Sequence, residues 1–274
     1  MSAATNVKFM CKECGCGLGG GEVQISGHAH DHGPGHHHGH EHHHDDGHEY
    51  AHSGKTVNLN RSLMEKNDRL AERNRGFFRA KKLLVLNVVS SPGSGKTTFI
   101  RETAAKLAGK LRVGVIVGDL ATDNDAAQLR KAKIPVVQIT TGTVCHLDAE
   151  MVSKAAAQLD LDKLDVLVIE NVGNLVCPAD YDLGEDLRVV LLSVTEGEDK
   201  PLKYPPMFHS AHVAIVTKSD LAVAVGFNRE QTFTNLKRVS HHAEIFEVSA
   251  KTGDGLKAWL EFLVTQRATA LNRR

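Results

Sequence analysis

Residues 86 to 102 read LNVVSSPGSGKTTFIRE, which places a glycine-rich turn directly after an apolar run and directly before a helical pattern. Gly93 and Gly95 allow the backbone to curl so that successive N–H groups point inward, with the positive end of the next helix behind them. Ser90 stands where the pattern GxxxxGK[ST] has its first glycine. In this strand and helix context, the segment predicts a phosphate-binding loop rather than an ordinary glycine turn.

The same region supplies side chains that bind phosphates and a metal ion. Lys96 can reach the β and γ phosphates of a nucleotide, and the Thr97 hydroxyl can bind Mg²⁺. An acid is needed for the metal and water network, and Glu170 ends the apolar run VLVIE. Asp119 also follows an apolar run, and Asp123 lies in the loop after it. Each of these acids can instead cap a helix or simply end a strand.

Short β-branched runs alternate with helical patterns from residue 83 to residue 268. Continuous apolar strands suit a parallel sheet buried on both faces, and the repetition of strand and helix implies right-handed crossovers. We therefore expect a three-layer α/β domain with about seven strands in a mostly parallel sheet, and ligands at the carboxyl ends of the strands. The expected strands are 83–90, 112–119, 135–141, 165–172, 187–194, 212–220 and 244–250, and the expected helices are 96–108, 123–133, 147–159, 229–240 and 254–268.

The balance of charge argues against nucleic acid as a partner, because Lys+Arg and Asp+Glu both number 33 and no basic surface is indicated. No apolar run approaches the roughly 18 residues that span a bilayer, and the first residues lack the apolar core of a signal peptide. The five cysteines are an odd number, which in a reducing compartment indicates metal ligands or buried thiols before disulfides. We expect a cytoplasmic protein without a membrane or nucleic-acid partner.

A second nucleotide signal follows the expected strand at 212–220, where the sequence TKSD resembles the guanine-specificity motif NKxD. The Asp220 carboxylate can accept two hydrogen bonds from guanine N1 and N2, which adenine cannot offer, and the Lys218 stem can lie along the base. Thr217 stands where the motif has asparagine. Further on, VSAKTGDG resembles the second base-contacting motif, in which the backbone N–H of Ala250 would meet guanine O6. These motifs favour GTP over ATP.

Residues 1–57 are rich in glycine and histidine and poor in large aliphatic side chains, so we expect a flexible metal-binding arm followed by a GTPase domain over residues 58–274. The pattern over 61–82 predicts a helix that leads into the domain.

The arm contains two sets of metal-binding side chains. Cys11, Cys14 and Cys16 form the motif CKECGC, whose thiolates can converge on one ion, although an incidental or redox role is an alternative. Twelve of the 17 histidines lie between His28 and His52, and we expect them to form a flexible multisite reservoir for Ni²⁺ or Zn²⁺. An engineered purification tag is the other explanation of this run, but the run is internal and interrupted by Gly, Asp and Glu.

A second candidate metal set lies within the expected domain. Cys145 and His146 lie between a strand and a helix, and Cys177 lies seven residues after Glu170. Both loops should emerge at the same edge of the sheet, so the three side chains can converge. The alternative is two buried structural cysteines and a solvated histidine. A metal bound here would be tied to the segment that moves when a γ-phosphate leaves.

Taken together, these motifs resemble those of the hydrogenase nickel-incorporation GTPases of the HypB family, which are kin to the UreG family of urease GTPases. CKECGC before a histidine run matches HypB rather than UreG. Nine residues precede Met10, whereas the cysteine motif of the family can begin just after the initiator. The resemblance rests on SSPGSGKTT, GDLATDNDA, TGTVCHLDA, ENVGNLVCP, TKSD, VSAKTGDGL and MCKECGCG.

The resemblance implies a SIMIBI-class P-loop GTPase that dimerises with nucleotide and passes Ni²⁺ toward the [NiFe]-hydrogenase large subunit precursor with a HypA-like accessory protein. It implies GTP and GDP contacts from Gly93, Ser94, Gly95, Lys96, Thr97, Thr98, Lys218, Asp220, Ser249, Ala250 and Lys251. It implies a catalytic and switch network of Lys96, Asp119, Asp123 and Glu170, with Mg²⁺ held by Thr97, Asp119 and Glu170. It implies Ni²⁺ or Zn²⁺ binding by Cys145, His146 and Cys177, contributed by two subunits, and Ni²⁺ binding by Cys11, Cys14 and Cys16.

The function that we expect is a metallochaperone in which GTP hydrolysis changes metal affinity or partner contact. Three alternatives remain open at this point. The chain could be a nickel store with a vestigial nucleotide site, a UreG-like urease maturation factor, or a small-molecule kinase, for which TKSD has no use.

Overall fold

The computed structural model describes residues 53–272, with side chains from Ser62 onward. The candidate ligands Cys11, Cys14 and Cys16 and the histidines between His28 and His52 lie outside the described residues. The first helix, α1 (Ser53–Ala80), begins earlier in the sequence than the pattern over 61–82 predicts.

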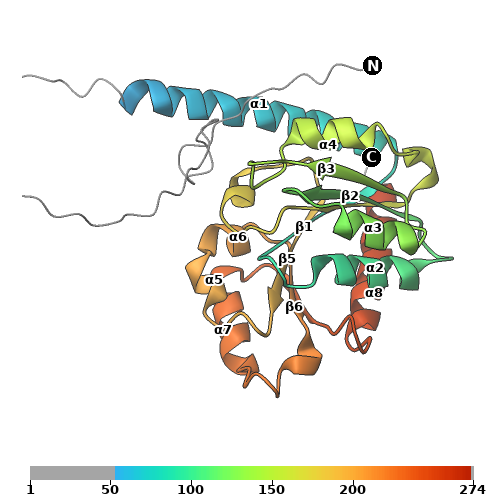
Figure 1. Cartoon of the computed structure of the whole chain (residues 1–274), viewed down its shortest axis with the longest axis vertical. Coiled ribbons are helices and arrows are strands. Elements are labelled where there is room, and N and C mark those ends of the chain that lie inside the picture. The colour runs from blue at the N-terminus through green and yellow to red at the C-terminus, as the bar shows by residue number, and fades with distance from the viewer. Residues whose placement is uncertain (1–52, 273–274) are drawn as a thin grey trace, which may run out of the picture. The chain divides into compact units, whose positions relative to one another are not determined.

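Seven parallel strands form a single sheet in the order β3-β2-β4-β1-β5-β6-β7 (Figure 1), which confirms the predicted α/β class and the predicted strands. β1 lies near the centre, between β4 and β5, and β3 and β7 are the two edges. The strands are β1 (Leu84–Ser90), β2 (Val113–Asp119), β3 (Val136–Thr140), β4 (Val166–Glu170), β5 (Leu187–Ser193), β6 (Val213–Thr217) and β7 (Glu244–Glu247).

Helices cover both faces of this sheet because alternate side chains of the central strands are apolar on both sides. Helices α2, α3 and α8 pack against the face that includes Leu86 and Val88. α1 from Met64 onward and α4 cover one part of the opposite face, and α6 and α7 cover the rest. The helices after α1 are α2 (Lys96–Leu107), α3 (Asn124–Lys131), α4 (Ala149–Ala156), α5 (Lys200–Lys203), α6 (Pro205–His209), α7 (Arg229–Val239) and α8 (Leu256–Asn272).

Local side-chain contacts fix where two of these helices begin. The Asp148 carboxylate accepts a hydrogen bond from the backbone N–H of Met151 at 2.7 Å and caps α4. The Asn228 side chain does the same for the N–H of Gln231 at the start of α7. The short helices α5 and α6 and three 3₁₀ turns, η1 (Leu161–Lys163), η2 (Cys177–Asp180) and η3 (Ser219–Leu221), were not indicated by the sequence pattern, because segments this short show no helical period.

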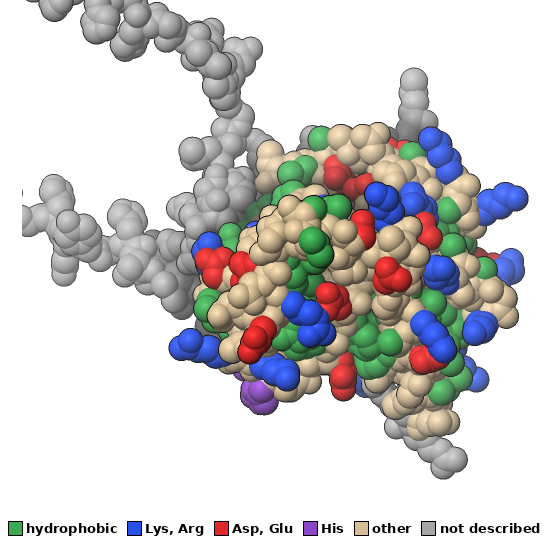
Figure 2. All heavy atoms as spheres, turned by 90° about the horizontal axis from the view of Figure 1, so that it is seen from below, with side chains coloured by type: hydrophobic (Ala, Val, Ile, Leu, Met, Phe, Trp, Pro, Cys, Tyr) green, Lys and Arg blue, Asp and Glu red, His purple; other side chains and the backbone are tan. Residues whose placement is uncertain are grey.

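One face of the described residues mixes both signs of charge (Figure 2). Figure 2 shows Lys and Arg side chains interspersed with Asp and Glu over the face seen from below in the view of Figure 1, so this face presents no continuous field of one sign. Among residues 53–272, no helix is both long enough and apolar enough to cross a bilayer.

Candidate nucleotide and metal site

The predicted phosphate loop joins the carboxyl end of β1 to the first turn of α2. Gly93 and Gly95 have φ values of 74° and 92°, a backbone region in which glycine is favoured over residues with a Cβ atom. Gly95 is the residue directly before α2, so the N–H groups of the loop lie at the positive end of that helix. This is the geometry of a phosphate-binding loop.

Ser90, the residue that replaces the first glycine of the motif, contributes its side chain to the loop. Its hydroxyl donates to the carbonyl of Ser91 at 2.7 Å and accepts from the Lys96 ammonium at 3.0 Å. Burial lowers the pKa of Lys96, although the carboxylate of Glu170 opposes this effect. A phosphate bound at the loop would offset the cost of burying this cation.

The predicted acid of the metal and water network lies directly against the loop. Glu170 ends β4 with 2% of its surface exposed, and its Oε1 accepts a hydrogen bond from the Thr97 hydroxyl at 2.7 Å. Burial raises the pKa of Glu170 to about 7, although the Thr97 hydrogen bond acts in the opposite direction. Its Oε2 is buried and has no hydrogen-bond partner within the described part of the chain. A hydroxyl beside an orphaned carboxylate oxygen fits Mg²⁺, which prefers oxygen ligands.

The two other predicted acids make local contacts. Asp119 accepts hydrogen bonds from the N–H groups of Ala121 and Thr122 at 2.9 and 2.7 Å, and, although partial burial opposes this, these N–H groups lower the pKa of Asp119. Asp123 precedes α3 but makes no side-chain cap, because its carboxylate pairs with Arg130 at 2.6 Å. The Asp123 carboxylate is therefore engaged with Arg130 on its own helix, and its place in the network stays a prediction.

The two base-contacting motifs flank the phosphate loop. Thr217 donates its hydroxyl hydrogen to the carbonyl of Ser94 at 2.8 Å, so the residue that replaces asparagine still ties β6 to the loop. Lys218, at φ 58°, donates its ammonium to the carbonyl of Gly93 at 2.7 Å. The Ser249 hydroxyl donates to Asp220 Oδ1 at 2.7 Å and so joins the two motifs.

The remaining predicted nucleotide contacts lie nearby in the chain. Thr98 is in the first turn of α2, and Ala250 and Lys251 are in the turn after β7. Sequence reasoning missed Glu196, whose Oε1 accepts from the Ser94 hydroxyl at 2.9 Å. The signal was available, since Glu196 lies two residues after the end of the expected strand 187–194, at the edge where ligands gather.

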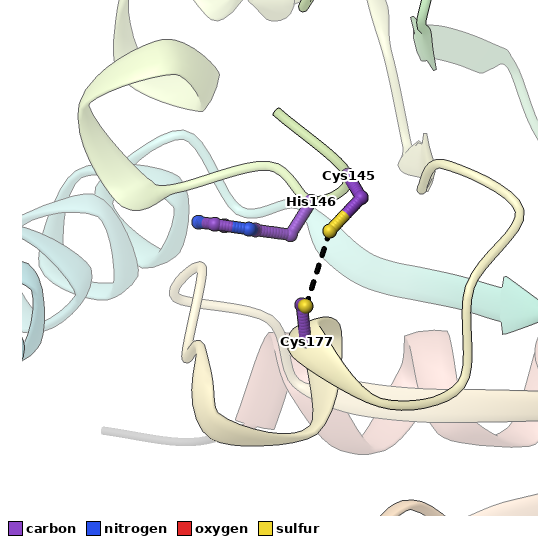
Figure 3. Close-up of side chains that lie close together, drawn as sticks. All are labelled: Cys145, His146 and Cys177. Atoms are coloured by element: carbon purple, nitrogen blue, oxygen red, sulfur yellow. Dashed lines mark hydrogen bonds between the residues drawn. The ribbon is translucent and has the colours of Figure 1, made fainter. Parts of the chain in front are cut away.

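The three predicted metal ligands of the domain come together in one chain. Cys145 and His146 lie in the loop between β3 and α4, and Cys177 begins η2. One ligand atom from each lies within 4.8 Å of the others, and the two sulfur atoms are 3.1 Å apart. Figure 3 shows the two sulfur atoms facing each other, with the imidazole of His146 extending to one side. A second subunit, which the resemblance implies, is not needed to assemble this set.

The surroundings of His146 suit a metal ligand. Its ring stacks on Tyr181 with centroids 3.9 Å apart, and its buried Nδ1 has no hydrogen-bond partner among residues 62–272. Burial lowers the pKa of His146, which favours the neutral imidazole that binds metals. Two thiols and an imidazole are the donors that Zn²⁺ and Ni²⁺ accept. The set therefore fits a borderline transition ion.

The metal and phosphate loops are in direct contact through the segment that follows β4. A Cβ atom added at Gly173 would lie 3.1 Å from Cα of Pro92 in the phosphate loop. Asn174, next in sequence, donates its side-chain amide to the carbonyl of Cys145 at 3.3 Å. A displacement of the phosphate loop would therefore push on the segment that leads to Cys177.

The fold and the phosphate loop define a P-loop nucleotide-binding protein of the α/β class, with a thiolate and imidazole set at the same edge of the sheet. Residues 84–247 match the family model described as "CobW/HypB/UreG, nucleotide-binding domain". The chain belongs to this family, which confirms the resemblance found in its motifs.

Curated and solved relatives are similar to this chain over the same domain. "Hydrogenase maturation factor HypB" of Escherichia coli is 52% identical over 205 residues, 75% of this chain and 71% of the relative. "Hydrogenase/urease maturation factor HypB" of Helicobacter pylori is 41% identical over 219 residues, 78% of this chain and 90% of the relative. A crystal structure of HypB from Helicobacter pylori in complex with nickel matches with a TM-score of 0.72 and 42% identity, covering 74% of this chain and 96% of that one.

Proposed function

We propose that the chain is a GTP-hydrolysing nickel metallochaperone that delivers Ni²⁺ during [NiFe]-hydrogenase maturation. The observation that carries the proposal is the position of Glu170, which accepts a hydrogen bond from Thr97 of the phosphate loop and lies seven residues before the candidate ligand Cys177. The names of the similar proteins from Escherichia coli and Helicobacter pylori support the process, and the nickel complex of the second supports the cargo.

The chain's own residues suggest how nucleotide and metal are coupled. Lys96 and the N–H groups around Gly93 and Gly95 would hold the β and γ phosphates, while Thr97 and Glu170 would hold Mg²⁺, which would supply positive charge to the transferring phosphoryl group. Loss of the γ-phosphate removes a partner of this cluster, and Glu170 can then shift. Since residues 171–177 follow Glu170 directly, a shift changes the spacing of the Cys145, His146 and Cys177 ligand set.

Several finer points of the proposal rest on the family resemblance. We place the protein in the cytoplasm as a homodimer that works with a HypA-like accessory protein on the hydrogenase large subunit precursor. Zn²⁺ is a second candidate ion for the Cys145, His146 and Cys177 set. We expect slow GTP turnover, because the quoted motifs contain neither an arginine finger nor a glutamine that orients water.

The test is the GTPase rate and the dimer fraction of the full chain, measured with and without Ni²⁺ in the parent and in Cys145→Ala. Nickel should change both quantities in the parent and neither in the variant, because the proposed coupling acts through the Cys145, His146 and Cys177 set; for the binding equilibria, linkage makes the effect reciprocal. Equal behaviour of the two proteins with and without nickel would contradict the coupling.

A second variant separates delivery from nickel storage. Lys96→Ala should still bind nickel but fail to release it when GTP is added, because the phosphate loop loses its cation. Lys106→Ala is the matched control, since Lys106 lies on the exposed side of the same helix α2. A storage protein would show the same nickel content and release in all three proteins.

A second candidate function is urease maturation, because the printed name of the Helicobacter pylori relative includes urease. Expression of the chain in strains that lack either maturation GTPase decides between the two. Restoration of hydrogenase activity without restoration of urease activity would support the first proposal, and the reverse would support the second.

A further inference from the structure

A line of buried polar side chains runs beneath the nucleotide and metal loops, and neither proposed site uses it. Asn87, in the middle of β1, is 0% exposed and interrupts the apolar run LVLNVVS. Asn171, Glu185 and Arg188 are each buried as well. Buried polar groups are costly unless they are hydrogen-bonded, so a continuous line of them calls for a physical explanation.

One end of the line is Asn171, the residue directly after Glu170. Its Oδ1 accepts hydrogen bonds from the backbone N–H of Leu147 at 3.2 Å and of Val172 at 2.9 Å. Leu147 follows His146, so this contact holds the loop that carries two of the three candidate metal ligands. The Asn171 side chain thereby joins the end of β4 to that loop.

The line continues through β1 to a buried ion pair. The Asn171 amide donates to Asn87 Oδ1 at 3.2 Å, and the Asn87 amide donates to Glu185 Oε1 at 3.1 Å. Glu185 also accepts from Nε of Arg188 at 3.1 Å. An ionised carboxylate only accepts hydrogen bonds, so Glu185 fixes which way the Asn87 amide points, and Asn87 in turn fixes the Asn171 amide. Asn171 is therefore held with its oxygen toward Leu147.

The other end of the line holds the loop of the third candidate ligand. The Arg188 guanidinium donates to the carbonyls of Ala179 at 2.9 Å and of Tyr181 at 2.8 Å, both in or next to η2, which Cys177 begins. Tyr181 stacks on His146. The two ligand loops are thus fixed by the two ends of one hydrogen-bonded line.

We propose that Asn171 is the positioning residue that couples the nucleotide state at Glu170 to the metal set of Cys145, His146 and Cys177. A shift of Glu170 moves Asn171, its neighbour in sequence. The partners of the Asn171 amide, Asn87 in the sheet and then Glu185 beside it, stay fixed. The hydrogen bond to Leu147 then lengthens or breaks, and the spacing of the metal ligands changes with it. This inference rests on the proposed function and assigns its coupling to one side chain.

The experiment measures a ratio of nickel affinities at the domain site in the full chain. Cys11, Cys14 and Cys16 are replaced by alanine, which leaves Cys145 and Cys177 as the only cysteines. Thiolate to nickel charge-transfer absorption then reports this site alone, because the histidines of the chain contribute no thiolate band. Nickel is titrated in the presence of Mg²⁺ with GDP or with a non-hydrolysable GTP analogue, and the two apparent dissociation constants give the ratio.

In this background, allosteric coupling of ordinary strength predicts a ratio of about 5- to 150-fold, and Asn171→Ala should bring it to about one. A purely structural role for Asn171 would weaken both affinities alike and leave the ratio unchanged. The matched control is Asn235→Ala, which removes another buried asparagine whose amide holds the carbonyl of Glu198 at 2.8 Å. The control should keep the ratio of the background protein.

The outcomes separate this inference from the proposed function. If the two nickel dissociation constants are equal in the background protein, in which Asn171 is unchanged, the proposed coupling is overturned and this inference with it. A ratio that differs from one and persists in Asn171→Ala overturns this inference alone. If circular dichroism shows that Asn171→Ala does not fold, Asn171→Leu replaces it, because leucine fills a similar volume but neither accepts from Leu147 nor donates to Asn87. Retention of the ratio in Asn171→Leu then overturns the inference.

Discussion

The substitution Asp220→Asn tests which base the nucleotide site reads. The Ser249 hydroxyl donates to Asp220 Oδ1 at 2.7 Å, so in the variant it will hold the amide oxygen at that position. The amide nitrogen then replaces Oδ2, where a carboxylate would accept a hydrogen bond from guanine N2, while the oxygen at the Oδ1 position can still accept from guanine N1. A donor would face the donor at guanine N2, whereas xanthine presents an oxygen at C2 and restores a hydrogen bond.

The size of the effect follows from the one hydrogen bond that is lost. A hydrogen bond to a charged group contributes about 1.5 to 3 kcal/mol, so its loss costs about that much. That range corresponds to a decrease in GTP affinity of about 10- to 150-fold. The affinity for XTP should rise at the same time.

Equilibrium competition of GTP, XTP and ATP against a fluorescent nucleotide gives the three affinities. Asp254→Asn is the matched control, because Asp254 lies in the same turn as Ser249 and its carboxylate accepts from the Thr252 hydroxyl at 2.6 Å. The control should keep the nucleotide preference of the parent. The reasoning is refuted if Asp220→Asn still binds GTP as tightly as the parent, or if ATP binds the parent as tightly as GTP does.

Two further predictions concern stability. In the nucleotide-free and metal-free protein, burial raises the pKa of Glu170 to about 7 from 4.5, so its neutral form stabilises the fold fully below pH 4.5 and that contribution is lost as the pH rises through 7. Chemical denaturation at pH 5 and at pH 8 gives the free energy of unfolding at each pH. From pH 5 to pH 8 this free energy should fall by about 3 kcal/mol more in the parent than in Glu170→Gln. Equal falls in the two proteins would contradict the prediction. Arg188→Met should lower the free energy of unfolding by about 3 to 5 kcal/mol, because it leaves the buried Glu185 carboxylate without its cation. In the control Arg112→Met, which breaks an exposed pair with Asp165, unfolding should change little, and a similar loss in both variants would contradict the assignment.

Much of the fold could be predicted from the sequence, because an unbroken run of apolar residues identifies a buried strand without knowledge of the rest of the fold. The run LLVLNVVS must be covered on both faces, and the turn at Gly93 and Gly95, in its sequence context, is typical of a connection from a strand to a helix. The order of the strands does not follow, since it depends on which crossovers bury the most surface. The convergence of Cys145 and Cys177 could be predicted because parallel strands end at a common edge.

The contacts that connect the two candidate sites could not be predicted from motifs. Asp123 pairs with Arg130 because α3 brings residues seven positions apart onto one side, which its place in the sequence GDLATDND does not indicate. Asn87 and Arg188 did carry a signal, since each is a polar residue inside an otherwise apolar strand. Such a residue must find a partner in the core, but its partners come from other strands and loops and are known only once the sheet is assembled.

The two ends of the parallel sheet, at the carboxyl and the amino ends of its strands, differ in how well they tolerate insertions. The phosphate loop, Glu170 and the loop of Cys145 all lie at the carboxyl ends of strands, whereas the turns over 108–112 and 240–243 enter β2 and β7 at the opposite end. Insertions in those turns lengthen connections without reaching either candidate site. They are therefore the places where a fluorescent reporter or an affinity label can be built into the protein while nucleotide and nickel are studied together.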